Sequence, residues 1–150
     1  MATGDGLVLG ENVGFLLQAA AALFLNELRN DLMAIGADVR YFGILRVLDV
    51  RGSITQQELG REVQYERSAV TALVDGMEAD GLVRRERHPR DRRANAIVIT
   101  PVGRKLLKRA APVVAASEKR LMATMTPDDY RAVQRALHRV LDLPEPATKS

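Results

Sequence analysis

The apolar residues recur at three- and four-residue steps over most of the chain, a pattern typical of amphipathic helices. The first stretch predicts a long helix over residues 11–36, where Gly36 tolerates the positive φ that often ends a helix. A second helix is predicted from Asp38 to about Val50. The apolar face of the first helix carries Val13, Leu16, Leu17, Ala20, Phe24, Leu28 and Leu32.

Two shorter helices are predicted next. Thr55 and Glu58 stand three residues apart and indicate a capping box, in which each side chain bonds to the backbone N–H of the other residue. This box begins a helix that ends near Val63, and after residues 64–66 a further helix extends to Asp80. Two short helices joined by a turn of three or four residues form a helix-turn-helix.

The apolar period then changes to two. Residues 82–87 and 95–100 flank the turn-like segment 88–91, and the second run alternates β-branched residues as a strand does. An antiparallel hairpin directly after a helix-turn-helix makes the winged version of that motif. The predicted fold class is therefore mainly α with a small β wing.

Two Thr-Pro pairs predict the starts of the last two helices, because threonine caps and proline fits the first turn (Thr100-Pro101 and Thr126-Pro127). The last helix is expected to bury Tyr130, Val133, Leu137 and Val140. The first and last helices thus carry strong apolar faces on either side of a small, self-contained lobe. Those faces need a cover, and a second copy of the chain is the simplest candidate.

Composition narrows the class of protein. The chain has 150 residues, 47% of them hydrophobic, as expected for one globular domain. It contains no cysteine, which excludes disulfides, thiolate metal sites and thiol redox chemistry. No apolar run reaches the roughly 18 residues of a membrane span. The first ten residues contain no Lys or Arg, so the basic start expected of a secretory signal is missing. We expect a cytoplasmic protein with no membrane association.

The net charge of +3 hides an uneven distribution. Residues 84–109 hold ten Lys/Arg and two acidic residues, giving +8, whereas the remaining chain carries −5. The densest part is almost entirely arginine. The planar guanidinium of arginine suits phosphates and guanine edges, whereas lysine would serve for solvation alone. This distribution favours a nucleic-acid partner over a merely solvated charged face.

The order of these motifs resembles the winged helix-turn-helix of the MarR family of bacterial transcription regulators. Residues 68–75 look like the recognition helix of that family, and residues 78–85 match its exit into the wing. The most specific match is Asp91-Arg92-Arg93-Ala94, followed by a strand and by Thr100-Pro101-Val102-Gly103. The similarity extends over about residues 11–143.

The resemblance implies one MarR-like domain over residues 1–150, with residues 11–36 and 101–143 as dimerisation helices and residues 38–100 as the winged lobe. It further implies a homodimer that binds a pseudo-palindromic operator in double-stranded DNA. Repressors are commoner than activators in this family, so a repressor is expected.

Motif geometry assigns DNA-binding roles. The first turn of a recognition helix faces base edges in the major groove, and the start of the preceding helix faces phosphate. An arginine of the wing is expected in the minor groove. The resemblance to the Asp-x-Arg wing of the family implies that Asp91 orients Arg93. The base-reading candidates are Arg67, Ser68 and Thr71; the phosphate candidates are Thr55, Gln56, Gln57, Arg84, Arg85, Arg87 and Arg90; the minor-groove candidates are Arg92 and Arg93.

Many relatives bind small aromatic or anionic effectors between the dimerisation region and the winged lobe. Phe15, Tyr41 and Phe42 are the aromatic residues near that expected hinge, although plain core packing is the favoured role for each. The chain lacks phosphate-loop, nucleophile-elbow and metal motifs, so no enzyme activity, cofactor or metal is expected. The alternative that remains open is a sequence-neutral architectural DNA-binding protein.

Overall fold

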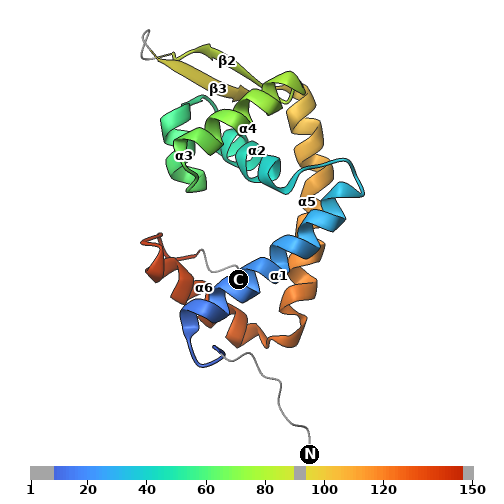
Figure 1. Ribbon diagram of the computed structural model, residues 1–150, viewed down its shortest axis with the longest axis vertical. Coiled ribbons are helices and arrows are strands. Elements are labelled where there is room, and N and C mark those ends of the chain that lie inside the picture. The colour runs from blue at the N-terminus through green and yellow to red at the C-terminus, as the bar shows by residue number, and fades with distance from the viewer. Residues whose placement is uncertain (1–8, 90–93, 147–150) are drawn as a thin grey trace, which may run out of the picture.

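Helix α5 (Pro101–Leu121) connects a winged lobe at one end of the molecule to a second group of helices at the other (Figure 1). The computed structural model describes residues 9–89 and 94–146. The remaining elements are α1 (Val13–Met33), α2 (Val39–Arg51), β1 (Ile54–Thr55), α3 (Gln56–Val63), α4 (Arg67–Ala79), β2 (Val83–Arg87), β3 (Asn95–Ile99), the 3-10 turn η1 (Met122–Thr124) and α6 (Pro127–Val140). The predicted fold class, mainly α with a small β wing, is confirmed.

The wing is a three-stranded antiparallel sheet in the order β1-β3-β2. The predicted hairpin of β2 and β3 is present, with Arg85 opposite Ile97. The sequence did not predict β1, in which Ile54 pairs with Ile97. A strand of two residues is too short to show a period, and Thr55 also caps α3, so its helix signal hides its strand pairing.

One continuous core holds the lobe together. It joins α2, α3, α4, the wing strands and the first turns of α5. Helix α4 contributes an entire face to this core, so its position relative to the wing is fixed by apolar packing. The fully buried side chains of this core include Ile44, Leu45, Leu48, Leu59, Val70, Val74, Met77, Val83 and Ile97.

A second, smaller cluster lies where α1 crosses α5. Leu28, Leu32, Ala37 and Ala110 are its buried members. The half-buried side chains of Phe42 and Leu106 pack against both this cluster and the core of the lobe. The two parts of the molecule therefore share side chains at their junction.

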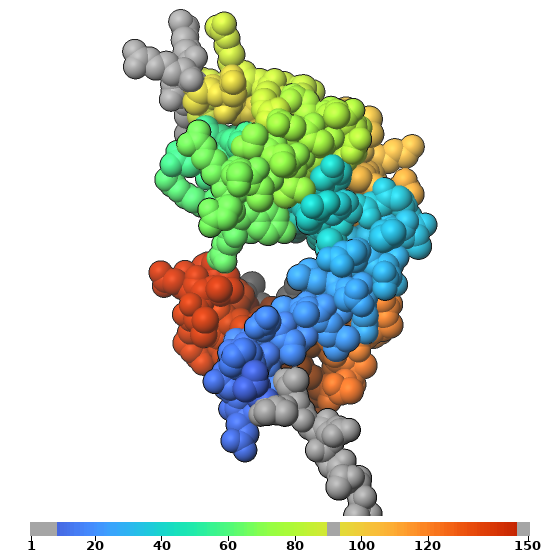
Figure 2. All heavy atoms as spheres, in the orientation of Figure 1, coloured from blue at the N-terminus to red at the C-terminus, as the bar shows by residue number. Residues whose placement is uncertain are grey.

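The terminal helices expose the apolar faces that the sequence predicts. Contrary to the expectation for the last helix, α6 has no buried residue in a single chain: Val133 is 37% exposed and Val140 is 74% exposed. The first half of α1 is likewise exposed, with Val13 at 68%. Figure 2 shows that the molecule is hollowed between the winged lobe and these terminal helices.

Within residues 9–89 and 94–146, no helix combines the length and apolar character that crossing a membrane requires.

Gly103 provides a test of the packing between α5 and the wing. A Cβ at this buried position would collide with the carbonyl oxygen of Leu82 and would lie 2.9 Å from Ile99 Cγ1. We expect Gly103→Ala to lower the free energy of unfolding by about 1–3 kcal/mol, the usual effect of overpacking. Thermal unfolding followed by circular dichroism measures this change.

The matched control is Gly43→Ala in α2, where no atom lies within 4 Å of the added Cβ. Alanine there is expected to leave the melting temperature unchanged or to raise it, because alanine is the better helix former by up to about 1 kcal/mol. Equal melting temperatures for the two variants would contradict the packing described here.

Candidate nucleic-acid interface

Helix α4 presents a polar outer face because its opposite face is buried in the core of the lobe. Arg67 and Ser68 begin the helix and are exposed, and Ala72 and Asp75 continue the exposed face. The first turn therefore presents a guanidinium group and a hydroxyl group to solvent. These are the groups that read guanine and other base edges in the major groove.

Thr71 is tied to the helix that precedes α4. Its hydroxyl donates to the carbonyl of Arg67 at 2.9 Å and accepts a hydrogen bond from Gln56 Nε2 at 2.5 Å. Since the only hydroxyl proton is already donated, Thr71 can meet a further partner only as an acceptor. The same bond fixes the side chain of Gln56 with its carbonyl oxygen pointing away from Thr71.

The predicted capping box at the start of α3 is confirmed. Thr55 Oγ1 accepts from the backbone N–H of Glu58 at 3.2 Å, and Glu58 Oε2 accepts from the backbone N–H of Thr55 at 2.7 Å. Hydrogen bonds from the backbone and then the side chain of Thr55 lower the pKa of Glu58. The Thr55 hydroxyl is therefore used within the box, while Gln57 is exposed beside it.

The turn between α3 and α4 contains two poorly suited residues. Gln64 adopts a left-handed conformation with φ of 54°, which glycine would adopt without strain. Glu66 stands at the N-cap of α4 and makes no capping hydrogen bond. The helix nevertheless begins at Arg67, which places that residue at the first helical position.

The wing arginines divide into two kinds. Arg84 is exposed and pairs with Glu86 of its own strand, and Arg87 is exposed at the end of β2. Arg85 instead points to α4, where it bonds to Asp75 and Glu78, in contrast to the phosphate role expected from the sequence. The remaining wing candidates, Arg90, Asp91, Arg92 and Arg93, lie outside the described residues.

The pKa of Arg85 lies above its ordinary value. Partial burial acts to lower this pKa, but the hydrogen bonds to Asp75 and Glu78 more than reverse the effect. The guanidinium thus stays charged between its two carboxylate partners. The sequence alone could not distinguish Arg85 from Arg84, because neighbouring residues of a strand point to opposite faces and only the packing shows which face is covered.

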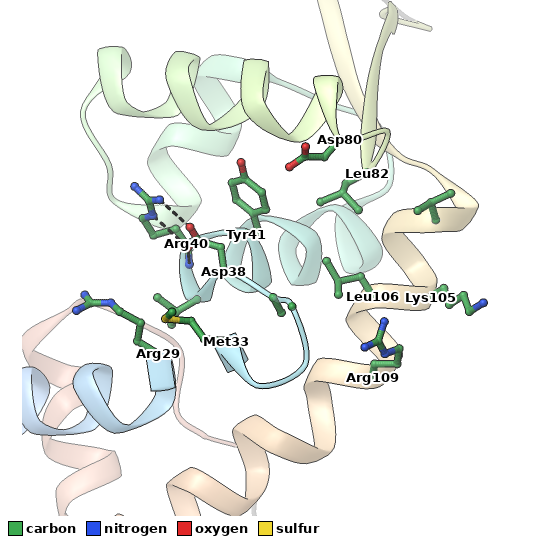
Figure 3. Close-up of a pocket in the computed structure, with 14 residues that line it drawn as sticks. Arg29, Met33, Asp38, Arg40, Tyr41, Asp80, Leu82, Lys105, Leu106 and Arg109 are labelled. Atoms are coloured by element: carbon green, nitrogen blue, oxygen red, sulfur yellow. Dashed lines mark hydrogen bonds and ion pairs between the residues drawn. The ribbon is translucent and has the colours of Figure 1, made fainter. Parts of the chain in front are cut away.

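A cleft of about 1120 Å³ lies beside the junction of α1, α2 and α5 (Figure 3). Tyr41 lines it, with Met33 and Leu106 among its apolar neighbours. Of the other aromatic candidates, Phe42 packs in the two cores and Phe15 lies exposed on α1; neither lines this cleft.

Basic residues outnumber acidic ones around the cleft, a feature that the sequence analysis did not find. Asp38 accepts hydrogen bonds from Arg40 Nε at 3.1 Å and Nη2 at 2.6 Å, and the pKa of Asp38 is lowered by this bonding. Arg109 Nη2 donates to the carbonyl of Ile35 at 2.8 Å, in the link between α1 and α2. The charged lining residues are Arg29, Asp38, Arg40, Asp80, Lys105 and Arg109.

Tyr41 extends from the cleft to α4. Its ring points toward α4 in Figure 3, and a Cβ on Gly76 would lie 2.7 Å from its hydroxyl oxygen. Burial, followed by the charge of Asp80, raises the pKa of Tyr41, which keeps the hydroxyl protonated. The Tyr41 hydroxyl therefore packs closely against α4 at Gly76.

In the part of the chain that the structure describes, no three His, Asp or Glu side chains gather in a way that could hold a metal ion.

Comparisons with known proteins agree with this architecture. The chain is 28% identical over 135 residues to the HTH-type transcriptional repressor Rv2887 of Mycobacterium tuberculosis, covering 90% of this chain and 97% of the relative. A MarR-family regulator from Silicibacter pomeroyi has a TM-score of 0.75 at 28% identity, covering 89% of this chain and 90% of its own. The transcriptional repressor CouR, solved on a 23-mer DNA duplex, has a TM-score of 0.81 at 27% identity, covering 91% of this chain and 99% of its own.

The family model described as "MarR family" matches residues 35–94, which span α2, the helix-turn-helix and the wing strands β1 and β2. This match, the relatives that align over nearly their whole length and the shared fold all support a MarR-family winged-helix transcriptional regulator.

Proposed function

We propose that this regulator is a repressor that binds a pseudo-palindromic operator as a homodimer and is released by a small aromatic anion. The observation that carries the proposal is the exposed first turn of α4, held in place by its buried opposite face. The structure of the relative CouR on a DNA duplex supports the use of this fold on double-stranded DNA. An architectural protein without an operator would need no such fixed reading face.

In the proposed complex, Arg67 and Ser68 read base edges, and Thr71 accepts a hydrogen bond while orienting Gln56. The backbone N–H groups of Gln56 and Gln57, at the positive end of α3, meet a phosphate, since the hydroxyl of Thr55 is used in its capping box. The proposed wing contacts are Arg84, Arg87 and Arg90 on phosphates and Arg92 or Arg93 in the minor groove, with Asp91 orienting Arg93.

The proposed dimer covers the apolar faces of the terminal helices. Residues 11–36 and 101–143 would form the dimerisation region and residues 38–100 the DNA-binding lobe of a single domain over residues 1–150. Support comes from the concentration of exposed large apolar side chains in α1 and after residue 124: Val13, Phe15, Leu16, Leu17, Leu23, Leu25, Met33, Met125, Val133, Val140, Leu141 and Leu143. Exposed apolar side chains concentrated in this way are typical of a surface that a partner covers.

The proposed effector site is the cleft that Tyr41 lines. Four basic and two acidic residues surround the cleft, which favours an anion. The aromatic face of Tyr41 favours a planar ring, and the contact of Tyr41 with Gly76 couples the site to α4. A ligand that prefers one position of α4 over another shifts the population of DNA-binding molecules.

Substituting one apolar residue tests the dimer. We expect Val133→Glu to shift the protein from dimer toward monomer, because the proposed interface would have to bury the new charge without a partner. Sedimentation velocity measures the shift. The matched control is Val50→Glu on α2, since Val50 is also exposed, at 64%, but lies outside the terminal helices. A wild-type protein that sediments as a monomer would contradict the proposal.

Sequence-specific binding is tested with a duplex that carries the operator, located by footprinting upstream regions. Arg67→Ala is expected to relax the preference at one base pair by about 1–3 kcal/mol, measured by competition with single-base variants of the duplex. Arg46→Ala, on the exposed side of α2, is expected to leave that preference unchanged. Equal displacement of the wild type by operator and bulk DNA at fixed salt would favour the architectural alternative.

Benzoate serves as the probe for the effector site. We expect benzoate to weaken operator binding and benzylamine, its cationic counterpart, to have no such effect. Arg29→Gln removes a positive charge from the cleft and is expected to raise the benzoate concentration needed, whereas Arg46→Gln outside the cleft should not. If both compounds act equally, or neither acts, the proposed effector class is wrong.

A further inference from the structure

Strand β2 lies at an edge of the wing sheet, where backbone groups on its outer side have no neighbouring strand. At Arg85 this edge is covered by the recognition helix. The backbone N–H of Arg85 donates to Glu78 Oε1 of α4 at 3.0 Å. A side chain of α4 thus takes the place of the missing strand.

The side chain of Arg85 adds a second connection to the same helix. Its Nη2 donates to Asp75 Oδ1 at 2.5 Å, and its Nη1 bonds to Glu78 Oε2. One guanidinium therefore joins two carboxylates that stand three residues apart on α4. We call Arg85, Asp75 and Glu78 the Arg85 clamp.

Arg84 shows what an arginine of this strand does without such a connection. It bonds to Glu86 on its own strand, so this pair joins no two elements. The side chain of Arg84 is 56% exposed and that of Arg85 is 28% exposed. The two adjacent arginines thus carry the same charge and lie on the same strand, but Arg84 faces solvent and Arg85 contacts α4.

The clamp joins the two elements that meet DNA in the proposed complex. The apolar core fixes α4 against the base of the wing, but β2 continues beyond Val83, its only fully covered residue, toward the tip. An arginine fork holding two carboxylates resists both sliding and rotation, because its planar donors have a fixed geometry. Arg85 therefore adds a polar restraint, beyond the apolar core, between the outer part of β2 and α4.

We propose that Arg85 is a positioning residue for DNA binding, which holds the wing at the angle where wing and recognition helix engage the duplex together, without touching DNA itself. The inference rests on the proposed operator binding. A second effect acts in the same direction: Arg85 offsets one of the two negative charges that Asp75 and Glu78 present on the helix that approaches phosphate.

Three variants test the clamp on the operator duplex used above: Arg85→Gln, Arg85→Lys and the control Arg84→Gln. Affinity is measured over a series of salt concentrations, and protection of the minor groove is mapped by hydroxyl-radical cleavage. A residue that contacts phosphate contributes about one unit to the slope of log affinity against log salt, whereas a positioning residue contributes none.

We expect Arg85→Gln to weaken operator binding about tenfold or more, to leave the salt slope unchanged and to lose the protection given by the wing. Arg84→Gln should reduce the slope by about one and keep that protection. Arg85→Lys keeps the charge but not the fork, so it should regain part of the affinity and none of the protection.

Two results would overturn the clamp: a reduced salt slope with unchanged protection in Arg85→Gln, which indicates a direct phosphate contact, or unchanged affinity and protection. If Arg85→Gln lowers the melting temperature, the Asp75→Asn variant tests the clamp instead, because it removes one carboxylate and keeps the Arg85–Glu78 bonds. Retained wing protection in Asp75→Asn would refute the clamp. Failure of wild type and Arg84→Gln to bind any duplex would instead refute the proposed operator binding.

Discussion

The burial of one face of α4 is the constraint on which the rest of the structure depends. Val70, Val74 and Met77 enter a core that also contains strands, so the recognition helix and the wing are built on the same packed side chains. The orientation of the exposed face of α4 is fixed because the opposite face is packed into the core. The position of the proposed base-reading face is therefore a consequence of apolar packing on the opposite side of the helix.

Charge is arranged around this core by the same rule. Alternate residues of β2 face opposite ways, so Arg84 remains at the surface while Arg85 meets the carboxylates of α4. The cleft beside Tyr41 likewise gathers basic residues from α1, α2 and α5, which are far apart in the chain. Residues that look equivalent in a run of like charges thus have different proposed roles, in DNA binding, positioning or ligand selection, according to the surface that each one reaches.

The helical periods, the capping box at Thr55 and the Thr-Pro starts predicted the helices, and the alternating residues predicted the hairpin, because each of these signals is local. The two-residue strand β1 was missed, since its pairing with Ile97 is set by a residue more than forty positions away in sequence. The motif also placed Arg67 at the start of the recognition helix. The partners of Arg85 and the basic lining of the cleft could not be predicted, because both depend on which side chains the fold brings together.

The lack of buried residues in α6 affects how the protein folds and assembles. The lobe has a complete core within one chain, whereas α6 buries no residue there and gains little from folding alone. In the proposed dimer its order would come from the partner, so folding of the terminal region and assembly would be one event that depends on protomer concentration. At a low protomer concentration, chains would then have a folded DNA-binding lobe but no partner lobe beside it. The amount of protein, as well as any ligand, would set how much of it can occupy a two-fold operator.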